Sequence, residues 1–215
     1  IGTADMDSRN LHESYDNMRP NYIGSPYMEK YEIDAELVEN VVSGLKRGKA
    51  AGLDSLTAEH LQHCHQLLPY VLAKLFNIML RYGYVPEDFG RSYTVPLQKG
   101  DKGCSKSLTV HDFRGISISC VISKVSEHCI LDRYSSYFVT SDNQFGFKKS
   151  TGCSHAIYSV RSIVNHYTAG SGTVNLCAID ISKAFDHMDH RGLFVKLMLR
   201  GVPEYLLSVI ENWFG

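Results

Sequence analysis

The chain has 215 residues, of which 44% are hydrophobic and 21% charged, and its formal net charge at pH 7 is −1. These proportions are ordinary for a globular protein of one large domain or parts of two, and the near-neutral charge gives no overall support for nucleic-acid binding. No apolar run reaches the roughly 18 residues of a membrane-spanning helix. The six cysteines are scattered without a C-x-x-C pair, which indicates reduced thiols and an intracellular protein.

The first 32 residues are polar and broken by proline and glycine, so we predict an irregular leader or linker. From Asp34 onward, apolar residues recur at helical spacing, with Asp34 as a good N-cap and Gly48 as a stop. A second apolar helix begins near Pro69 and ends at Gly83. This second helix is expected to supply core and no chemistry.

Between these helices lies a basic turn punctuated by glycine. It contains Lys46, Arg47 and Lys49, and a new helix follows near Thr57. Lysine side chains and free backbone N–H groups in such a turn can contact phosphates. A solvated turn without function explains the same residues.

The middle of the chain predicts an antiparallel ribbon. Residues 91–97 alternate as in a strand, 99–103 form a tight turn, and 111–119 form the returning strand. The ribbon carries several basic side chains: Lys99, Lys102, Lys106 and Arg114. Residues 91–149 hold nine basic and five acidic residues, so this region is basic although the whole chain is not.

A helix over residues 121–138 is predicted next, with one inward face formed by Val121, Val125, Cys129, Ile130 and Tyr134. Aromatic residues then alternate with glycine and lysine from Gln144 to Gly152. This pattern suits a surface on which bases stack and phosphates meet positive charge. A glycine-bent strand with Phe145 and Phe147 in the core fits equally well. Residues 155–166 predict another helix.

The run from Val174 to Ile179 is apolar and β-branched, which predicts a buried strand that ends at Asp180. A carboxylate at the end of a buried strand is costly unless it is paired, and a divalent cation is its usual partner. An N-cap for a following helix is an equally good explanation. Residues 183–188 predict a turn into a helix. A further apolar helix follows, with Leu193, Phe194, Leu197 and Met198 facing inward and Gly201 as its cap, and Pro203 starts the last helix.

Four of these segments resemble the reverse transcriptase of non-LTR retrotransposons, and they occur in that family's order between Ile33 and Gly215. Residues 176–186 are similar to motif A of the palm, residues 46–54 to the N-terminal extension motif, the basic ribbon to the fingers hairpin, and residues 144–147 to the Gln-x-Gly-Phe motif. Two departures stand out. Gly115 follows Arg114 where the family often has proline, and Lys148 and Lys149 replace the usual arginine.

The resemblance implies an α+β fold of the right-hand polymerase type, mostly helical, with an antiparallel fingers hairpin and the start of the palm sheet. It divides the chain into a leader at 1–32, an N-terminal extension with fingers at 33–170, and the first part of the palm at 171–215. It also implies an RNA-directed DNA polymerase that uses two Mg²⁺ or Mn²⁺ ions and binds an RNA template, a DNA primer and deoxynucleoside triphosphates. A nuclear and cytoplasmic location is then expected.

The roles that the resemblance assigns to individual residues fall into three groups. Asp180 is implied as catalytic, and Asp180 and Ile181 as metal ligands. The incoming nucleotide would contact Lys99, Arg114, Ala184 and Phe185. The nucleic acid would contact Lys46, Lys49, Gln144, Phe147, Lys148 and Lys149.

The chain contains no Asp-Asp pair, which this family supplies from a later hairpin. A two-metal site needs such paired carboxylates, so we expect this chain to be a fragment that extends no primer on its own. The alternative is a degenerate or domesticated remnant that only binds RNA or a protein partner.

Overall fold

Helices make up most of the chain in the computed structural model, which describes residues 2–99, 108–181 and 184–215. The described residues contain one sheet, an antiparallel pair of strands. They fall into a larger unit, residues 1–137 with 189–215, and a smaller unit, residues 138–188. None of the helices described is long and apolar enough to cross a membrane.

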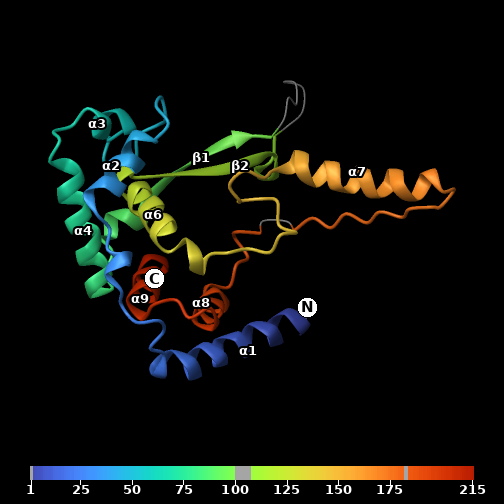
Figure 1. Cartoon of the computed structure of the whole chain (residues 1–215), viewed down its shortest axis with the longest axis horizontal. Helices are drawn as coiled ribbons and strands as arrows, with labels where there is room; N and C mark the ends of the chain where they lie inside the picture. The colour runs from blue at the N-terminus through green and yellow to red at the C-terminus, as the bar shows by residue number, and fades with distance from the viewer. Residues whose placement is uncertain (1, 100–107, 182–183) are drawn as a thin grey trace. The chain divides into compact units, whose positions relative to one another are not determined.

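The core of the larger unit lies among four helices, which are labelled in Figure 1. They are α2 (Ala35–Ser43), α4 (Leu68–Tyr82), α6 (Val121–Arg133) and α9 (Glu204–Phe214). Helix α2 packs on α4 and α6, and α4 packs on α9. Val38, Phe76 and Val125 are completely or almost completely buried there. The predicted inward face of the helix over residues 121–138 is confirmed, because all five of its residues are buried. The predicted helix end at residue 138 is wrong, because α6 ends at Arg133 and Tyr134 follows it as the C-cap.

Local sequence signals explain where these helices begin and end. The Asp34 carboxylate accepts the Leu37 N–H at 2.8 Å and caps α2, as predicted. Helix α2 ends at Ser43, before Gly48. Gly83 ends α4 with φ of +62°, a left-handed conformation that costs glycine little.

The further helices of the larger unit are mostly short. They are η2 (Glu29–Tyr31), α3 (Ala58–Gln62), α5 (Glu87–Gly90), η3 (Val110–Asp112), η4 (Ser135–Tyr137) and α8 (His190–Leu199). In α8, three of the four side chains predicted to face inward are buried, namely Phe194, Leu197 and Met198, whereas Leu193 is half-buried.

The predicted antiparallel ribbon is confirmed as strands β1 (Ser92–Gln98) and β2 (Phe113–Ser119). Ser92 lies opposite Ser119, and Gln98 lies opposite Phe113. The predicted turn after Lys99 lies outside the described residues, as do Lys102 and Lys106.

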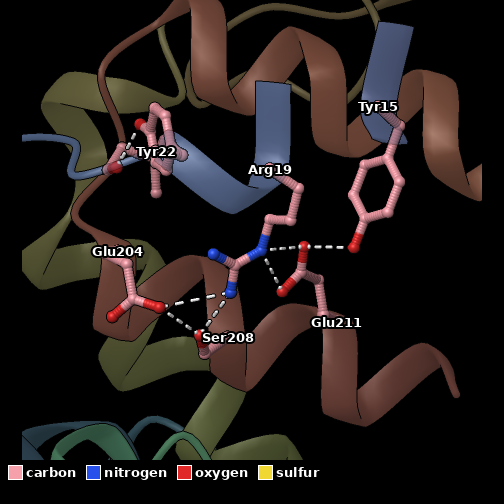
Figure 2. Close-up of polar contacts among 7 residues, drawn as sticks. Tyr15, Arg19, Tyr22, Glu204, Ser208 and Glu211 are labelled. Carbon is pink, nitrogen blue, oxygen red and sulfur yellow. Dashed lines mark hydrogen bonds and ion pairs between the residues drawn. The ribbon is translucent and has the colours of Figure 1, made fainter. Parts of the chain in front are cut away.

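The prediction of an irregular leader is wrong for its first half, which forms α1 (Gly2–Met18) followed by the short helix η1 (Arg19–Asn21). Helix α1 packs on α8, where the Tyr15 and Phe194 ring centroids are 5.8 Å apart. Figure 2 shows Arg19 reaching the α9 carboxylates of Glu204 and Glu211. Distant partners therefore stabilise a helix whose own sequence is a weak helix signal.

The smaller unit contains α7 (Cys153–Ala169), which includes the helix predicted over residues 155–166. A segment without regular secondary structure follows it. The prediction of a buried strand at Val174–Ile179 is wrong. These residues pair with no strand among the described residues, and Ile179 is 88% exposed. An apolar run forms a strand only when another strand satisfies its N–H and C=O groups. Residues 184–187 form a turn without continuing into the predicted helix.

Candidate nucleic-acid interface

The basic turn between α2 and α3 is held in a defined shape by side chains of α3. Gln62 donates to the carbonyl oxygens of Val42 and Leu45 at 3.1 and 3.0 Å and accepts a bond from Arg47 Nε at 2.7 Å. The Gly48 N–H donates to the Glu59 carboxylate at 2.5 Å, and this bond holds the pKa of Glu59 below its usual value. These bonds tie the first part of the turn to α3 and so define the backbone around Lys46 and Lys49.

The far end of the turn is packed against the start of α6. A methyl group added at Gly52 would lie 2.7 Å from Cys120 Cα and 2.9 Å from Cys120 N, so only glycine allows this backbone approach. The Tyr93 hydroxyl of β1 donates to the Ala51 carbonyl oxygen at 2.9 Å. The Gly52 contact brings the basic turn beside the start of α6, and the Tyr93 hydrogen bond ties the turn to β1.

The approach encloses a basic cavity of about 330 Å³ between the turn and α6. Among the residues that the structure describes, its charged and titratable lining consists of Lys46, Lys49, Lys124 and His128, without an Asp or Glu. Three ammonium groups around a cavity without carboxylates favour a polyanionic ligand such as a nucleic-acid backbone. We call this site the lysine cavity.

Sequence reasoning named Lys46 and Lys49 but missed Lys124 and His128. Both missed residues belong to α6, one turn apart, and therefore lie on one face of that helix. The i, i+4 spacing of two basic residues outside the apolar stripe was the available signal. This spacing did not indicate which segment of the chain would pack beside that face of α6.

The two predicted triphosphate contacts of the hairpin lie on one face of it. Arg114 is opposite Leu97 in the strand register, and the Lys99 N–H donates to the Asp112 carbonyl oxygen at 2.7 Å. Since side chains alternate along a strand, Lys99 and Arg114 are diagonal neighbours. Both residues are exposed. The arrangement can present two positive charges to one anionic group.

In the smaller unit, the segment from Gln144 to Gly152 exposes Phe147 almost completely, at 93%. The alternative placement of Phe147 in the core is therefore wrong. Its φ of +57° is unusual for a bulky residue, and strain of this kind persists where the surroundings or a function require it. Lys148 pairs with Asp142 at 3.3 Å, Lys149 is exposed, and the Gln144 amide donates to the Gly146 carbonyl oxygen at 3.1 Å.

The structure brings Phe147 together with a second predicted residue, Phe185. Their rings meet edge to face with centroids 6.0 Å apart and an interplanar angle of 89°. Phe185 is 74% exposed and therefore does not belong to the core. Two exposed aromatic rings in contact offer a surface on which a base or sugar can pack.

Asp180, Ile181 and Ala184 are exposed, and the described residues contain no group of three His, Cys, Asp or Glu side chains that could hold a metal ion. The two-metal arrangement requires at least a pair of carboxylates, so the described residues alone do not fit it. Asp180 also caps no described helix, because α8 is capped by Asp189, whose carboxylate accepts the Gly192 N–H at 2.9 Å.

Comparisons with known proteins connect these features to a family. No protein-family model matches the chain. It is 26% identical to the RNA-directed DNA polymerase from mobile element jockey of Drosophila funebris across 94% of its own length. It is also 28% identical across 88% to the putative 115 kDa protein in type-1 retrotransposable element R1DM of Drosophila melanogaster.

The chain is a distant relative of the non-LTR retrotransposon reverse transcriptases. It is also 23% identical across 67% of its length to the Retrovirus-related Pol polyprotein from type-2 retrotransposable element R2DM of Drosophila melanogaster. The chain spans 23% of the jockey protein, 18% of the R1DM protein and 13% of the R2DM protein.

The structure gives a physical account of one departure from the reverse transcriptase pattern. Gly115 lies opposite Pro96 in the hairpin, and a methyl group there would lie 2.9 Å from the Thr94 side-chain methyl. A larger residue at 115 therefore requires Thr94 to move. The hydroxyl of Thr94 lies 2.9 Å from that of Ser117, so this movement would break a cross-strand hydrogen bond.

Proposed function

We propose that this chain forms the fingers and the first part of the palm of an RNA-directed DNA polymerase from a non-LTR retrotransposon. The relation to the jockey polymerase over 94% of the chain supports this, together with the order of the four motifs. The proposed boundaries are 33–170 for the N-terminal extension with fingers and 171–215 for the palm segment. The complete enzyme would have the right-hand polymerase fold.

The proposed partners are an RNA template, a DNA primer and deoxynucleoside triphosphates. Lys99 and Arg114, which share one face of the hairpin, would bind the triphosphate of the incoming nucleotide. Ala184 and Phe185 would contact its sugar, with the Phe185 ring excluding a 2′-hydroxyl by volume and by offering it no hydrogen bond.

Polymerase chemistry implies divalent cations, here Mg²⁺ or Mn²⁺. We propose that Asp180 and the carbonyl of Ile181 contribute ligands to them. Because the described residues supply no further carboxylates around Asp180, we assign no reaction step to this chain alone.

The property that this chain can express by itself is binding to the phosphate backbone of RNA. The lysine cavity carries this proposal, because Gly52 and Tyr93 bring Lys46, Lys49 and Lys124 around one cavity that no carboxylate lines. Gln144, Phe147, Lys148 and Lys149 are proposed as a further contact, in which the exposed Phe147 ring accepts a base.

Salt dependence of RNA binding tests the lysine cavity. Each lysine that meets a phosphate of single-stranded RNA contributes about 0.7 to the slope of log affinity against log salt concentration. The double variant K46Q/K124Q should therefore bind more weakly and lower that slope by about 1.4, equally for all RNA sequences. The control R9Q/K196Q removes the same charge from exposed positions on α1 and α8, away from the cavity, and should change the slope less.

Equal slopes for the two double variants would show that the lysine cavity is not the RNA site. The alternative role, a remnant that binds RNA without synthesis, gives the same binding result. Incorporation of deoxynucleotides by a longer protein that contains this segment separates the two, because only the polymerase role requires it.

A further inference from the structure

A second cavity of the larger unit has no place in the proposed polymerase function. It has a volume of about 500 Å³ and lies among η2, α4, the end of α6 and α9. Four tyrosines form much of its wall: Tyr27, Tyr31, Tyr134 and Tyr205. It shares no lining residue with the lysine cavity. We call it the tyrosine cavity.

The tyrosines form one continuous aromatic cluster. Tyr31 and Tyr134 stack with centroids 5.0 Å apart and an interplanar angle of 13°, and Tyr205 meets Tyr134 edge to face at 6.2 Å. Tyr31 and Tyr134 are buried, whereas Tyr27 packs its edge on Tyr205 at 5.7 Å and remains 61% exposed. Burial raises the pKa of Tyr205 and of Tyr134, so these two hydroxyls stay protonated. The exposed ring at the mouth is that of Tyr27.

Charged side chains give the mouth of the tyrosine cavity a net positive charge. Lys74 and Arg81 line the cavity from α4, seven positions and so about two turns apart, and both are exposed. Neither has an ion-pair partner in the part of the chain that the structure describes. Glu32 is the one carboxylate that lines the cavity within residues 2–99, 108–181 and 184–215.

The one amide of the lining is already engaged, which limits how a ligand can be recognised. Asn77 accepts the Ile33 N–H at 3.0 Å and donates to the Ile33 carbonyl oxygen at 2.7 Å. Recognition must therefore come from ring faces, tyrosine hydroxyls and the two cations. These groups suit a ligand that is flat, aromatic and negatively charged. A volume of 500 Å³ is within the usual range for a small-ligand site.

We propose that the tyrosine cavity binds one unpaired nucleotide of an RNA strand. The base stacks on Tyr27 beside Tyr205, and the adjoining phosphates lie at Lys74 and Arg81. Stacking on a tyrosine tolerates any base, so the site adds affinity without sequence preference. The choice of RNA as ligand rests on the proposed function, whereas the site itself depends on residues that the proposed function does not use.

Binding of a short single-stranded RNA, compared with the same strand made abasic, tests the proposal. Loss of one base–aromatic stack weakens binding by about five-fold to a hundred-fold. Y27A should show this loss with the intact RNA and little loss with the abasic strand, and Y27F should bind like the unmodified chain. Y70A is the matched control, because Tyr70 is also 61% exposed but does not line the cavity. K74Q/R81Q should weaken binding of both strands.

The outcomes separate this proposal from the lysine cavity. The tyrosine cavity is not a nucleotide site if Y27A binds intact RNA as well as Y70A does. The same conclusion follows if Y27A loses as much affinity for the abasic strand as for the intact RNA. Aromatic grooves also accept proline-rich peptides. Saturable binding of a polyproline peptide that Y27A abolishes, with RNA binding unchanged, would likewise overturn the proposal. If Y27A weakens RNA binding as expected but K46Q/K124Q leaves it unchanged, only the lysine cavity is refuted. If the chain binds no RNA at all, both proposals are overturned.

Discussion

Removal of the Arg19 side chain tests how the N-terminal segment is attached to the rest of the larger unit. Arg19 Nε donates to both carboxylate oxygens of Glu211 at 2.8 and 2.9 Å, and its terminal NH₂ donates to Ser208 at 2.8 Å and to Glu204 at 3.2 Å (Figure 2). The bond to Glu211 raises the pKa of Arg19. One guanidinium therefore joins η1 to two successive turns of α9.

The expected magnitude follows from the burial of the partners. Breaking a fully buried ion pair costs about 3–5 kcal/mol, whereas an exposed pair contributes about 0–1 kcal/mol. The Arg19 and Glu211 side chains are 24% and 16% exposed, and Glu211 keeps the Tyr15 hydroxyl as a donor at 2.8 Å. We therefore expect Arg19→Ala to lower the free energy of unfolding by about 2–3 kcal/mol. For a chain of this size that corresponds to a fall in Tm of about 4–12 °C.

Thermal and urea unfolding followed by circular dichroism measures the loss. Arg9→Ala is the matched control, because Arg9 is an exposed arginine on the adjoining helix α1. A double-mutant cycle with Glu211→Ala isolates the pair, and a coupling of about 1–3 kcal/mol is expected. Equal stabilities of Arg19→Ala and Arg9→Ala, or a coupling of zero, would show that the contact between Arg19 and Glu211 does not hold the N-terminal segment on α9.

Two further predictions concern the α2 cap and Phe185. The Leu37 N–H and, to a lesser extent, Arg133 hold the pKa of Asp34 below its usual value, so its stabilisation is present above about pH 4 and is lost as the pH falls through the folded-state pKa. In urea unfolding at neutral pH, Asp34→Ala should lower the free energy of unfolding by about 1 kcal/mol, and at acid pH by less. A loss of stability that does not change with pH would contradict this. In an active polymerase that contains this segment, Phe185→Val should admit ribonucleotides while leaving deoxynucleotide use and Tm largely intact, because the ring is exposed. An unchanged ratio of ribonucleotide to deoxynucleotide incorporation would count against its contact with the sugar.

The sequence by itself determined the elements whose signals are local. Asp34 as a cap, Gly83 as a stop and the spacing of Val121, Val125 and Cys129 each act within a few residues, so α2, α4 and α6 were predictable. Motif order likewise indicated the family that the comparisons support. The roles assigned to Asp180, Lys99, Arg114 and Phe185 come from that resemblance and remain predictions.

Tertiary structure decided the features that depend on distant partners. Helix α1 is polar, and its order depends on Tyr15 and Arg19 meeting α8 and α9 across more than 170 residues. The run at 174–179 has the composition of a strand, but composition supplies no second strand for its backbone groups. The lysine cavity exists because Gly52 lets two backbones meet. Contacts of this kind close long loops, and their free energy depends on both ends of the loop, so no local pattern in the chain reports them.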